Sequence, residues 1–139
     1  MAAYVLIDAG PIIAYYNKRD IWHEKARHYI EKSTEQFVTT VACISEALYF
    51  LREDYRVQNE LLLDLSVGLY NCESLTLSDF SRIAELNSKY ADFPGDFADL
   101  SLLVISERLD IEPIASLDDD FQVYRRYGRK KFKLVFPSD

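Results

Sequence analysis

Residues 4–11 read YVLIDAGP, and this stretch decides the fold. Tyr4–Ile7 is a short apolar run of residues that favour a β-strand, and it ends at Asp8. Pro11 suits the first turn of a helix, where its missing N–H needs no partner, so a helix is expected over Pro11–Asn17. The chain therefore begins as a strand that passes directly into a helix through an aspartate.

The rest of the chain repeats this alternation of strand and helix. Further strands are expected at Phe37–Thr40, Glu73–Leu77, Pro113–Leu117 and Lys133–Phe136. Helices are expected after an N-cap at Asp20, over Val41–Leu51, along the leucines of 61–69, after an N-cap at Ser78 and over Phe97–Leu109. Such alternation predicts an α/β fold with a central parallel sheet of about four to five strands and helices on both faces. In such folds ligands bind at the carboxyl ends of the strands.

Length and composition predict one domain over residues 1–139. Hydrophobic residues make up 49% of the chain, which excludes a disordered tail or a collagen-like fibre, and two cysteines exclude a disulfide scaffold. The start, MAAYVLIDAG, lacks the basic segment of a secretory signal. No run of about 18 apolar residues could span a membrane. The protein is therefore expected in the reducing cytoplasm.

The charge is unevenly distributed. The chain has 16 basic and 23 acidic residues and a net charge of -7, yet residues 121–137 hold six basic residues and no acidic one. The excess of acidic residues in the rest of the chain argues against binding nucleic acid through a broad basic surface. It does not exclude an enzyme whose acidic residues hold metal ions, because a bound divalent cation reverses the local charge.

Five acidic residues stand out when they are placed on this scheme. Asp8 follows the first strand and Asp118 follows the fourth, so both are expected at the carboxyl edge of one sheet. Asp96 and Asp99 lie three residues apart on one face of a helix start. Glu46 is the only charge in the apolar stretch 41–51. Each has an ordinary alternative role, such as a turn residue, an N-cap, a partner of the helix dipole or one half of an ion pair. Together they predict a single acidic pocket.

An acidic pocket of this kind favours a divalent metal ion. Carboxylates pressed together repel one another, and a hard cation removes that conflict. Mg²⁺ and Mn²⁺ both take oxygen ligands. A bound ion can activate a water and polarise a phosphoryl oxygen, which is the chemistry of phosphodiester hydrolysis.

The ordered set of motifs resembles the PIN domain and, within it, the VapC-type toxins of toxin–antitoxin pairs. The resemblance covers about residues 4–136 and rests on VLIDAGPIIA (5–14), DIWHEKA (20–26), ISEALYFL (44–51), YADFPGDFADLSLLVISERL (90–109) and IASLDDDFQVYR (114–125). It implies a three-layer, Rossmann-like fold and RNA cleavage that depends on Mg²⁺ or Mn²⁺. It also implies a homodimer and a small antitoxin protein that blocks the site.

The resemblance also assigns roles to individual residues. The catalytic acids would be Asp8, Glu46, Asp99 and Asp118. Of these, Asp8, Asp99 and Asp118 are expected to be the metal ligands, whereas Glu46 would bind a second ion or orient the attacking water. Two further residues, Asp96 as an additional acid and Ser116 as an orienting hydroxyl, are expected to support them. Many family members carry a hydroxyl residue directly after the first aspartate, but this chain has Ala9 there, which puts one hydrogen bond in doubt.

The basic residues near the C-terminus have two interpretations. Arg125, Arg126, Arg129, Lys130 and Lys131 could guide RNA phosphates toward the pocket. Alternatively, they form a solvated rim that keeps an edge strand from pairing with another chain.

Two other functions compete with the nuclease. The chain could be a PIN-like module that binds RNA or a partner without cleaving, although all four acidic positions are intact. It could also be a phosphatase or receiver-type protein, which likewise gathers aspartates at strand ends. A haloacid-dehalogenase-type phosphatase needs Asp-x-Asp at the first strand, and Gly10 occupies the second of those positions here.

Overall fold

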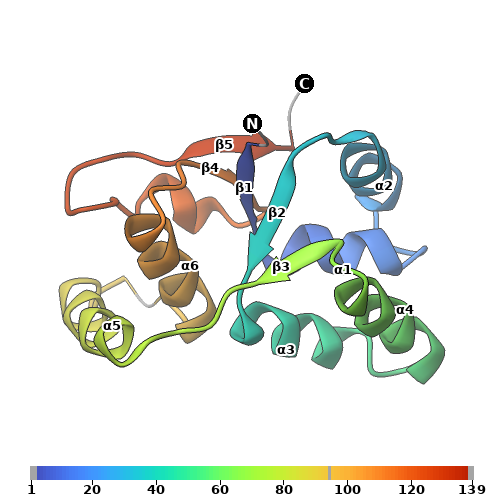
Figure 1. The fold of residues 1–139 in the computed structure, drawn as a ribbon, viewed down its shortest axis with the longest axis horizontal. Coiled ribbons are helices and arrows are strands. Elements are labelled where there is room, and N and C mark those ends of the chain that lie inside the picture. Colours follow the sequence, from blue (N-terminus) through green and yellow to red (C-terminus); the bar gives the residue numbers. More distant parts are fainter. Residues whose placement is uncertain (1–2, 94, 138–139) are drawn as a thin grey trace.

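The computed structural model describes residues 3–93 and 95–137. Five parallel strands form one sheet in the order β3-β2-β1-β4-β5 (Figure 1). The strands are β1 (Tyr4–Ile7), β2 (Gln36–Thr39), β3 (Tyr70–Cys72), β4 (Pro113–Ala115) and β5 (Lys133–Phe136). The helices are α1 (Ala9–Tyr16), α2 (His23–Lys32), α3 (Val41–Phe50), α4 (Tyr55–Ser66), α5 (Leu77–Lys89) and α6 (Phe97–Arg108), with a short 3₁₀ helix η1 at Asp119–Gln122.

The central strand β1 divides the core into two layers. Val5 and Ile7 face a cluster built with α1, α2, α3 and α4, whereas Leu6 faces a cluster built mainly with α5 and α6. Alternate residues of a strand point to opposite faces, so a fully apolar strand needs cover on both sides. The predicted three-layer α/β fold is confirmed, and Figure 1 shows the sheet between its two groups of helices.

The third strand was predicted in the wrong place. It occupies Tyr70–Cys72, not 73–77. Tyr70 is fully buried and pairs with Phe37 of β2, which anchors the strand earlier in the chain. The alternating residues after it form the loop that leads into α5, which begins at Leu77 because Thr76 and Asp79 form a capping box there. This capping interaction also replaces the predicted cap at residue 78.

The second helix also begins later than predicted. Asp20 is not its N-cap, because α2 starts at His23 after Trp22, which provides no side-chain cap. Instead, Asp20 Oδ1 accepts the backbone N–H of Trp22 at 2.8 Å and closes a turn before the helix. Within the described residues, no helix is long and apolar enough to cross a membrane.

Candidate metal centre

Three aspartates meet at the carboxyl end of the sheet. One carboxylate oxygen from each of Asp8, Asp99 and Asp118 lies within 4.8 Å of the other two. They come from the end of β1, the first turn of α6 and the loop after β4. The fold therefore brings together the three residues that were predicted as metal ligands.

Asp8 is fixed where β1 becomes α1. Its backbone N–H donates to the Ala115 carbonyl of β4 at 3.0 Å, which extends the pairing of the two strands. Its Oδ1 accepts the backbone N–H of Ala9 at 2.8 Å, so Asp8 is the N-cap of α1. Ala9 thus donates a main-chain hydrogen bond to Asp8, although it lacks the hydroxyl that many family members carry at this position. The Asp8 side chain is left almost fully buried.

Asp96 and Asp99 act together at the start of α6. Asp96 is the N-cap, and its Oδ1 accepts the backbone N–H of Asp99 at 2.8 Å. This capping role does not remove Asp96 from the site, because it also lines the acidic pocket. Asp99 is buried in the first helical turn, where the positive end of the helix dipole favours its charge.

Ser116 connects two of the close carboxylates. Its hydroxyl donates to Asp8 Oδ2 at 2.9 Å and accepts the backbone N–H of Asp118 at 3.0 Å. Asp118 Oδ1 in turn accepts the backbone N–H of Asp120 at 2.9 Å and caps η1. A single hydroxyl therefore ties the carboxylate of β1 to the loop that carries Asp118.

Glu46 lines the same pocket from α3, but it lies outside the close set of three. It forms no ion pair with any residue in 3–93 or 95–137, so the alternative of a basic partner across the core finds no support there. Partial burial, followed by repulsion from Asp96 and Asp8, raises the pKa of Glu46 to about 6. Glu46 is therefore mostly ionised at neutral pH, and its carboxylate is more basic than that of an ordinary glutamate.

Burial and mutual repulsion also raise the pKa values of two of the close aspartates, Asp8 and Asp99. Burial raises the pKa of Asp8 to about 6, with further repulsion from Asp118 and Asp96. Burial and then repulsion from Asp8 raise the pKa of Asp99 to about 8. At neutral pH these groups compete for a proton, because three carboxylates this close are stable only when some of their charge is neutralised.

The composition of the pocket fits a hard divalent cation. It encloses about 530 Å³, and its charged lining consists of six aspartates and one glutamate, with no described lysine, arginine or histidine among the lining residues. The donor atoms of the close set are all carboxylate oxygens, the ligands that Mg²⁺ and Mn²⁺ take. No protein cation among these lining residues neutralises the charge, so a bound metal ion is the natural counter-charge.

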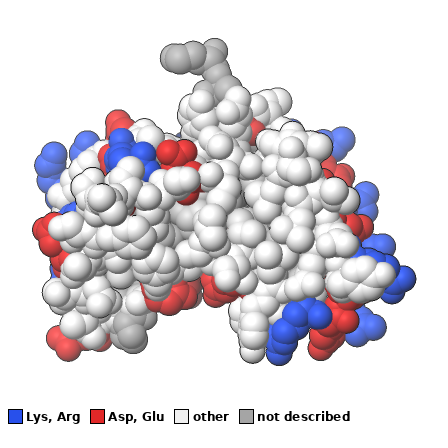
Figure 2. Space-filling model, turned by 60° about the horizontal axis from the view of Figure 1, so that its bottom comes forward, with Lys and Arg blue, Asp and Glu red and all other residues white. Residues whose placement is uncertain are grey.

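A mostly apolar groove adjoins the pocket. It encloses about 840 Å³, and Glu46 and Asp96 line both. The half-exposed rings of Phe80 and Phe97 stack in it with their planes 10° apart. Figure 2 brings this side of the molecule forward and shows a broad uncharged area, with Lys and Arg toward the edges of the view. The acidic pocket thus opens beside an apolar surface.

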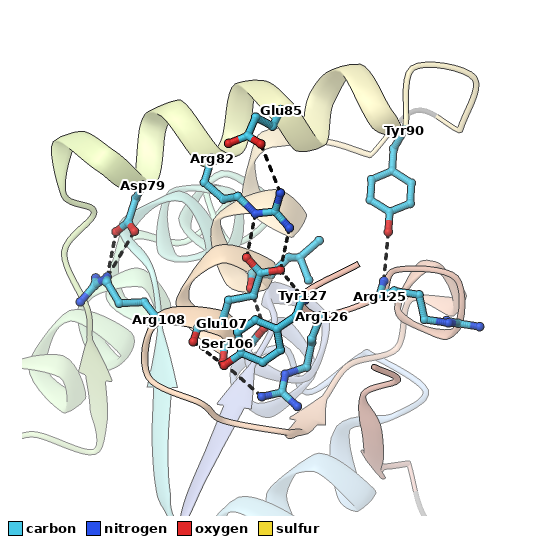
Figure 3. Close-up of polar contacts among 11 residues, drawn as sticks. Asp79, Arg82, Glu85, Tyr90, Ser106, Glu107, Arg108, Arg125, Arg126 and Tyr127 are labelled. Carbon is cyan, nitrogen blue, oxygen red and sulfur yellow. Dashed lines mark hydrogen bonds and ion pairs between the residues drawn. The ribbon is translucent and has the colours of Figure 1, made fainter. Parts of the chain in front are cut away.

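Arg126 of the basic segment lies elsewhere, beside residues at the C-terminal end of α6 (Figure 3). Tyr127 donates its N–H to Glu107 at 2.6 Å, and Arg126 pairs with Asp110 at 2.8 Å. At about 1.5 Å per helical residue, Glu107 is about 12 Å along α6 from Asp99. Arg126 is also buried, and its guanidinium donates to Asp110 and to the Ser106 carbonyl, so it does not face the solvent from which RNA would approach.

The other predicted RNA contacts differ in exposure. Arg125 is half-buried and donates to the main-chain carbonyls of three preceding residues. Arg129, Lys130 and Lys131 are exposed.

Sequence reasoning did not include Asp119 and Asp120, which line the pocket, or Tyr124 among the site residues. Tyr124 is fully buried, and its hydroxyl donates to Asp99 Oδ2 at 3.1 Å. Its only signal in the sequence is its position within the stretch 114–125, because a tyrosine that follows a 3₁₀ turn cannot be told from an ordinary core residue.

Comparison with known proteins supports the resemblance along almost the whole chain. No protein-family model matches the chain. Over 134 residues the chain is 23% identical to Ribonuclease VapC26 of Mycobacterium tuberculosis, covering 94% of this chain and 99% of that protein.

Solved structures share the fold at low sequence identity. The VapC20 toxin of M. tuberculosis, described as cleaving the sarcin-ricin loop, superposes with a TM-score of 0.76 at 16% identity, over 86% of this chain and 93% of that one. A toxin–antitoxin complex from Klebsiella pneumoniae gives 0.70 at 16% identity, over 97% and 98%. VapBC2 of Rickettsia felis, bound to promoter DNA, gives 0.65 at 11% identity, over 94% and 96%. In sequence and in fold, these comparisons confirm the resemblance of this chain to the PIN-domain toxins of the VapC type.

Proposed function

We propose that this protein is a metal-dependent endoribonuclease and the toxin of a toxin–antitoxin pair. One observation carries the proposal: three carboxylates from distant parts of the chain meet within 4.8 Å in a pocket lined by no basic residue that the structure describes. The likeness to a VapC ribonuclease and to VapC toxin structures supports RNA as the substrate.

The proposed metal ligands are the three close aspartates, Asp8, Asp99 and Asp118. Mg²⁺ or Mn²⁺ bound there would polarise the phosphoryl group and neutralise the charge that develops on it. Asp8 is held by two hydrogen bonds, and Ser116 couples its position to that of Asp118. The site is therefore preorganised before an ion or RNA arrives.

Glu46 is the proposed general base. It lines the pocket without belonging to the close set of three, so its carboxylate is available to a water. In the proposed step, the water oxygen attacks phosphorus, Glu46 accepts the water proton, and the P–O bond to the ribose oxygen breaks, with that oxygen taking a proton from solvent as it leaves. A pKa of about 6 suits this role, because the group is ionised at neutral pH and still has appreciable basicity.

RNA would also contact the protein away from the reacting phosphate. Arg129, Lys130 and Lys131 are exposed near the far end of α6, so we propose that they bind backbone phosphates several nucleotides away from the cut. Arg125 would contribute at the margin of this surface.

The proposed partners beyond RNA follow from the relatives. Two of the solved neighbours are described as a toxin–antitoxin complex and as VapBC2. We propose that a small antitoxin binds this protein and covers its site, and that the active toxin is a homodimer. Size-exclusion chromatography with light scattering, with and without the product of a neighbouring gene, tests both proposals.

A cleavage assay tests the proposed function. Purified protein is incubated with a mixed RNA pool in Mn²⁺, in Mg²⁺ and in EDTA, beside the variants Asp99→Asn and Asp92→Asn. Asp92 is exposed and does not line the pocket, so its change is a control that removes the same charge. Cleavage is expected in either metal for the wild type and Asp92→Asn, and not in EDTA or with Asp99→Asn. Undiminished cutting by Asp99→Asn would contradict the assignment of the site.

A further inference from the structure

Tyr124 is enclosed by other aromatic side chains in the core. Its ring is fully buried, and three other aromatic rings pack around it edge to face. These are Tyr90, Phe93 and Phe121, with ring centroids 5.0, 5.6 and 5.3 Å from that of Tyr124. A ring enclosed on several sides cannot swing, so the direction of its hydroxyl is fixed by the fold.

The hydroxyl of Tyr124 points at the candidate metal centre. It donates to Asp99 Oδ2 at 3.1 Å, while the backbone N–H of Asp99 is taken by Asp96. Among the described residues, Tyr124 is the one side chain that donates a hydrogen bond to the Asp99 carboxylate. Asp8 and Asp118, by contrast, are coupled to each other through Ser116.

The chain leaves space for this hydroxyl at Gly95. A Cβ at that position would lie 2.0 Å from the Tyr124 oxygen and 3.0 Å from Cζ of its ring. The first distance is far below any real contact, so a side chain at Gly95 would force the tyrosine to move. Gly95 directly precedes Asp96, the N-cap of α6, so the loop that shapes the start of this helix also makes room for the hydroxyl.

We propose that Tyr124 is a positioning residue of the metal centre, which orients the Asp99 carboxylate toward Asp8 and Asp118, and that Gly95 is required to admit its hydroxyl. This inference rests on the proposed metal-dependent function. Removing such an orienting partner typically weakens metal affinity by about 10- to 100-fold.

Calorimetric titration of Mn²⁺ into the metal-free protein tests the proposal without relying on cleavage. Tyr124→Phe keeps the ring and removes the hydroxyl. Tyr90→Phe is the matched control, because its hydroxyl belongs to the same aromatic cluster but accepts the backbone N–H of Arg125 at 3.0 Å (Figure 3). The dissociation constant for Mn²⁺ is expected to rise about tenfold in Tyr124→Phe and to stay unchanged in Tyr90→Phe. The thermal midpoint of each variant in EDTA records any effect on the fold alone.

A second variant separates positioning from packing. Gly95→Ala should weaken Mn²⁺ binding strongly when residue 124 is tyrosine and much less in the Tyr124→Phe background, because the hydroxyl that collides with the new methyl group is then missing. Additive effects of the two changes would overturn the proposed link between Gly95 and Tyr124. Wild-type affinity in Tyr124→Phe would overturn the positioning role while leaving the metal centre intact. Failure of the wild type itself to bind Mn²⁺ would refute the metal centre and, with it, this inference.

Discussion

The acidic pocket should make the metal-free protein less stable as the pH rises. The pKa of Asp99 is about 8 in the folded protein, against 3.8 for an ordinary aspartate, so between these values the folded state holds a proton that the unfolded state has released. The contribution of Asp99 to the free energy of unfolding is fully present below about pH 4 and is lost as the pH rises through about 8. Between about pH 6.5 and 7.5, one such group lowers the free energy of unfolding by about 1 kcal/mol per pH unit.

Urea denaturation in EDTA at several pH values measures this slope. Asp99→Asn is the informative comparison, because asparagine keeps an oxygen that can accept the Tyr124 hydroxyl but has no proton to lose in this range. The two proteins differ only at residue 99, so the difference in slope reports the loss of this titrating carboxyl. Equal slopes for wild type and Asp99→Asn would refute the reasoning. Mn²⁺ at about a hundred times its dissociation constant should restore about 2.7 kcal/mol to the wild type.

Three other changes have expected outcomes. Ser116→Ala removes the donor to Asp8 Oδ2, so calorimetry should show about tenfold weaker Mn²⁺ binding, and unchanged affinity would count against the orienting role. Tyr16→Phe removes a partly buried 2.6 Å hydrogen bond to Asp64 and a buried one to Tyr70, and the free energy of unfolding in urea should fall by about 1–2 kcal/mol; an unchanged value would show that these bonds add nothing. Replacing the exposed basic residues 129–131 by alanine should raise KM for RNA without changing kcat and lower the salt dependence of binding by about 0.7 for each RNA phosphate that the variant no longer binds. An unaltered salt dependence would assign these residues to a solvated rim.

The sequence was most informative where local and long-range signals agreed. The run 4–7, followed by an aspartate and a helix start, predicted β1 and α1 because every local preference there matches the tertiary fold. It was least informative at β3, where the pattern after Tyr70 looks like a strand but Thr76 and Asp79 cap a helix. A short edge strand contains too few residues to show a clear pattern, and its register depends on pairing with Phe37.

In the candidate site, too, some features could be predicted from the sequence, whereas others depend on tertiary packing. The convergence of acids at one edge could be predicted, because the carboxyl ends of parallel strands meet at one edge. The burial of Arg126 could not, since its partner Asp110 comes from a turn after α6. The role of Tyr124 was equally hidden, because it depends on a ring orientation and on a space left by Gly95. Charge alone could not distinguish the exposed basic residues 129–131 from Arg126, which is buried and paired with Asp110.

The most direct test of the metal centre is the location of a bound ion. Crystals of the protein grown with Mn²⁺ would reveal the ion by its anomalous scattering. A single strong peak, or a closely spaced pair, within ligand distance of the carboxylates of Asp8, Asp99 and Asp118 is the predicted result, and it should vanish in Asp99→Asn. A saturating Mn²⁺ concentration that leaves this pocket without a peak, or a peak that persists in Asp99→Asn, would contradict the account.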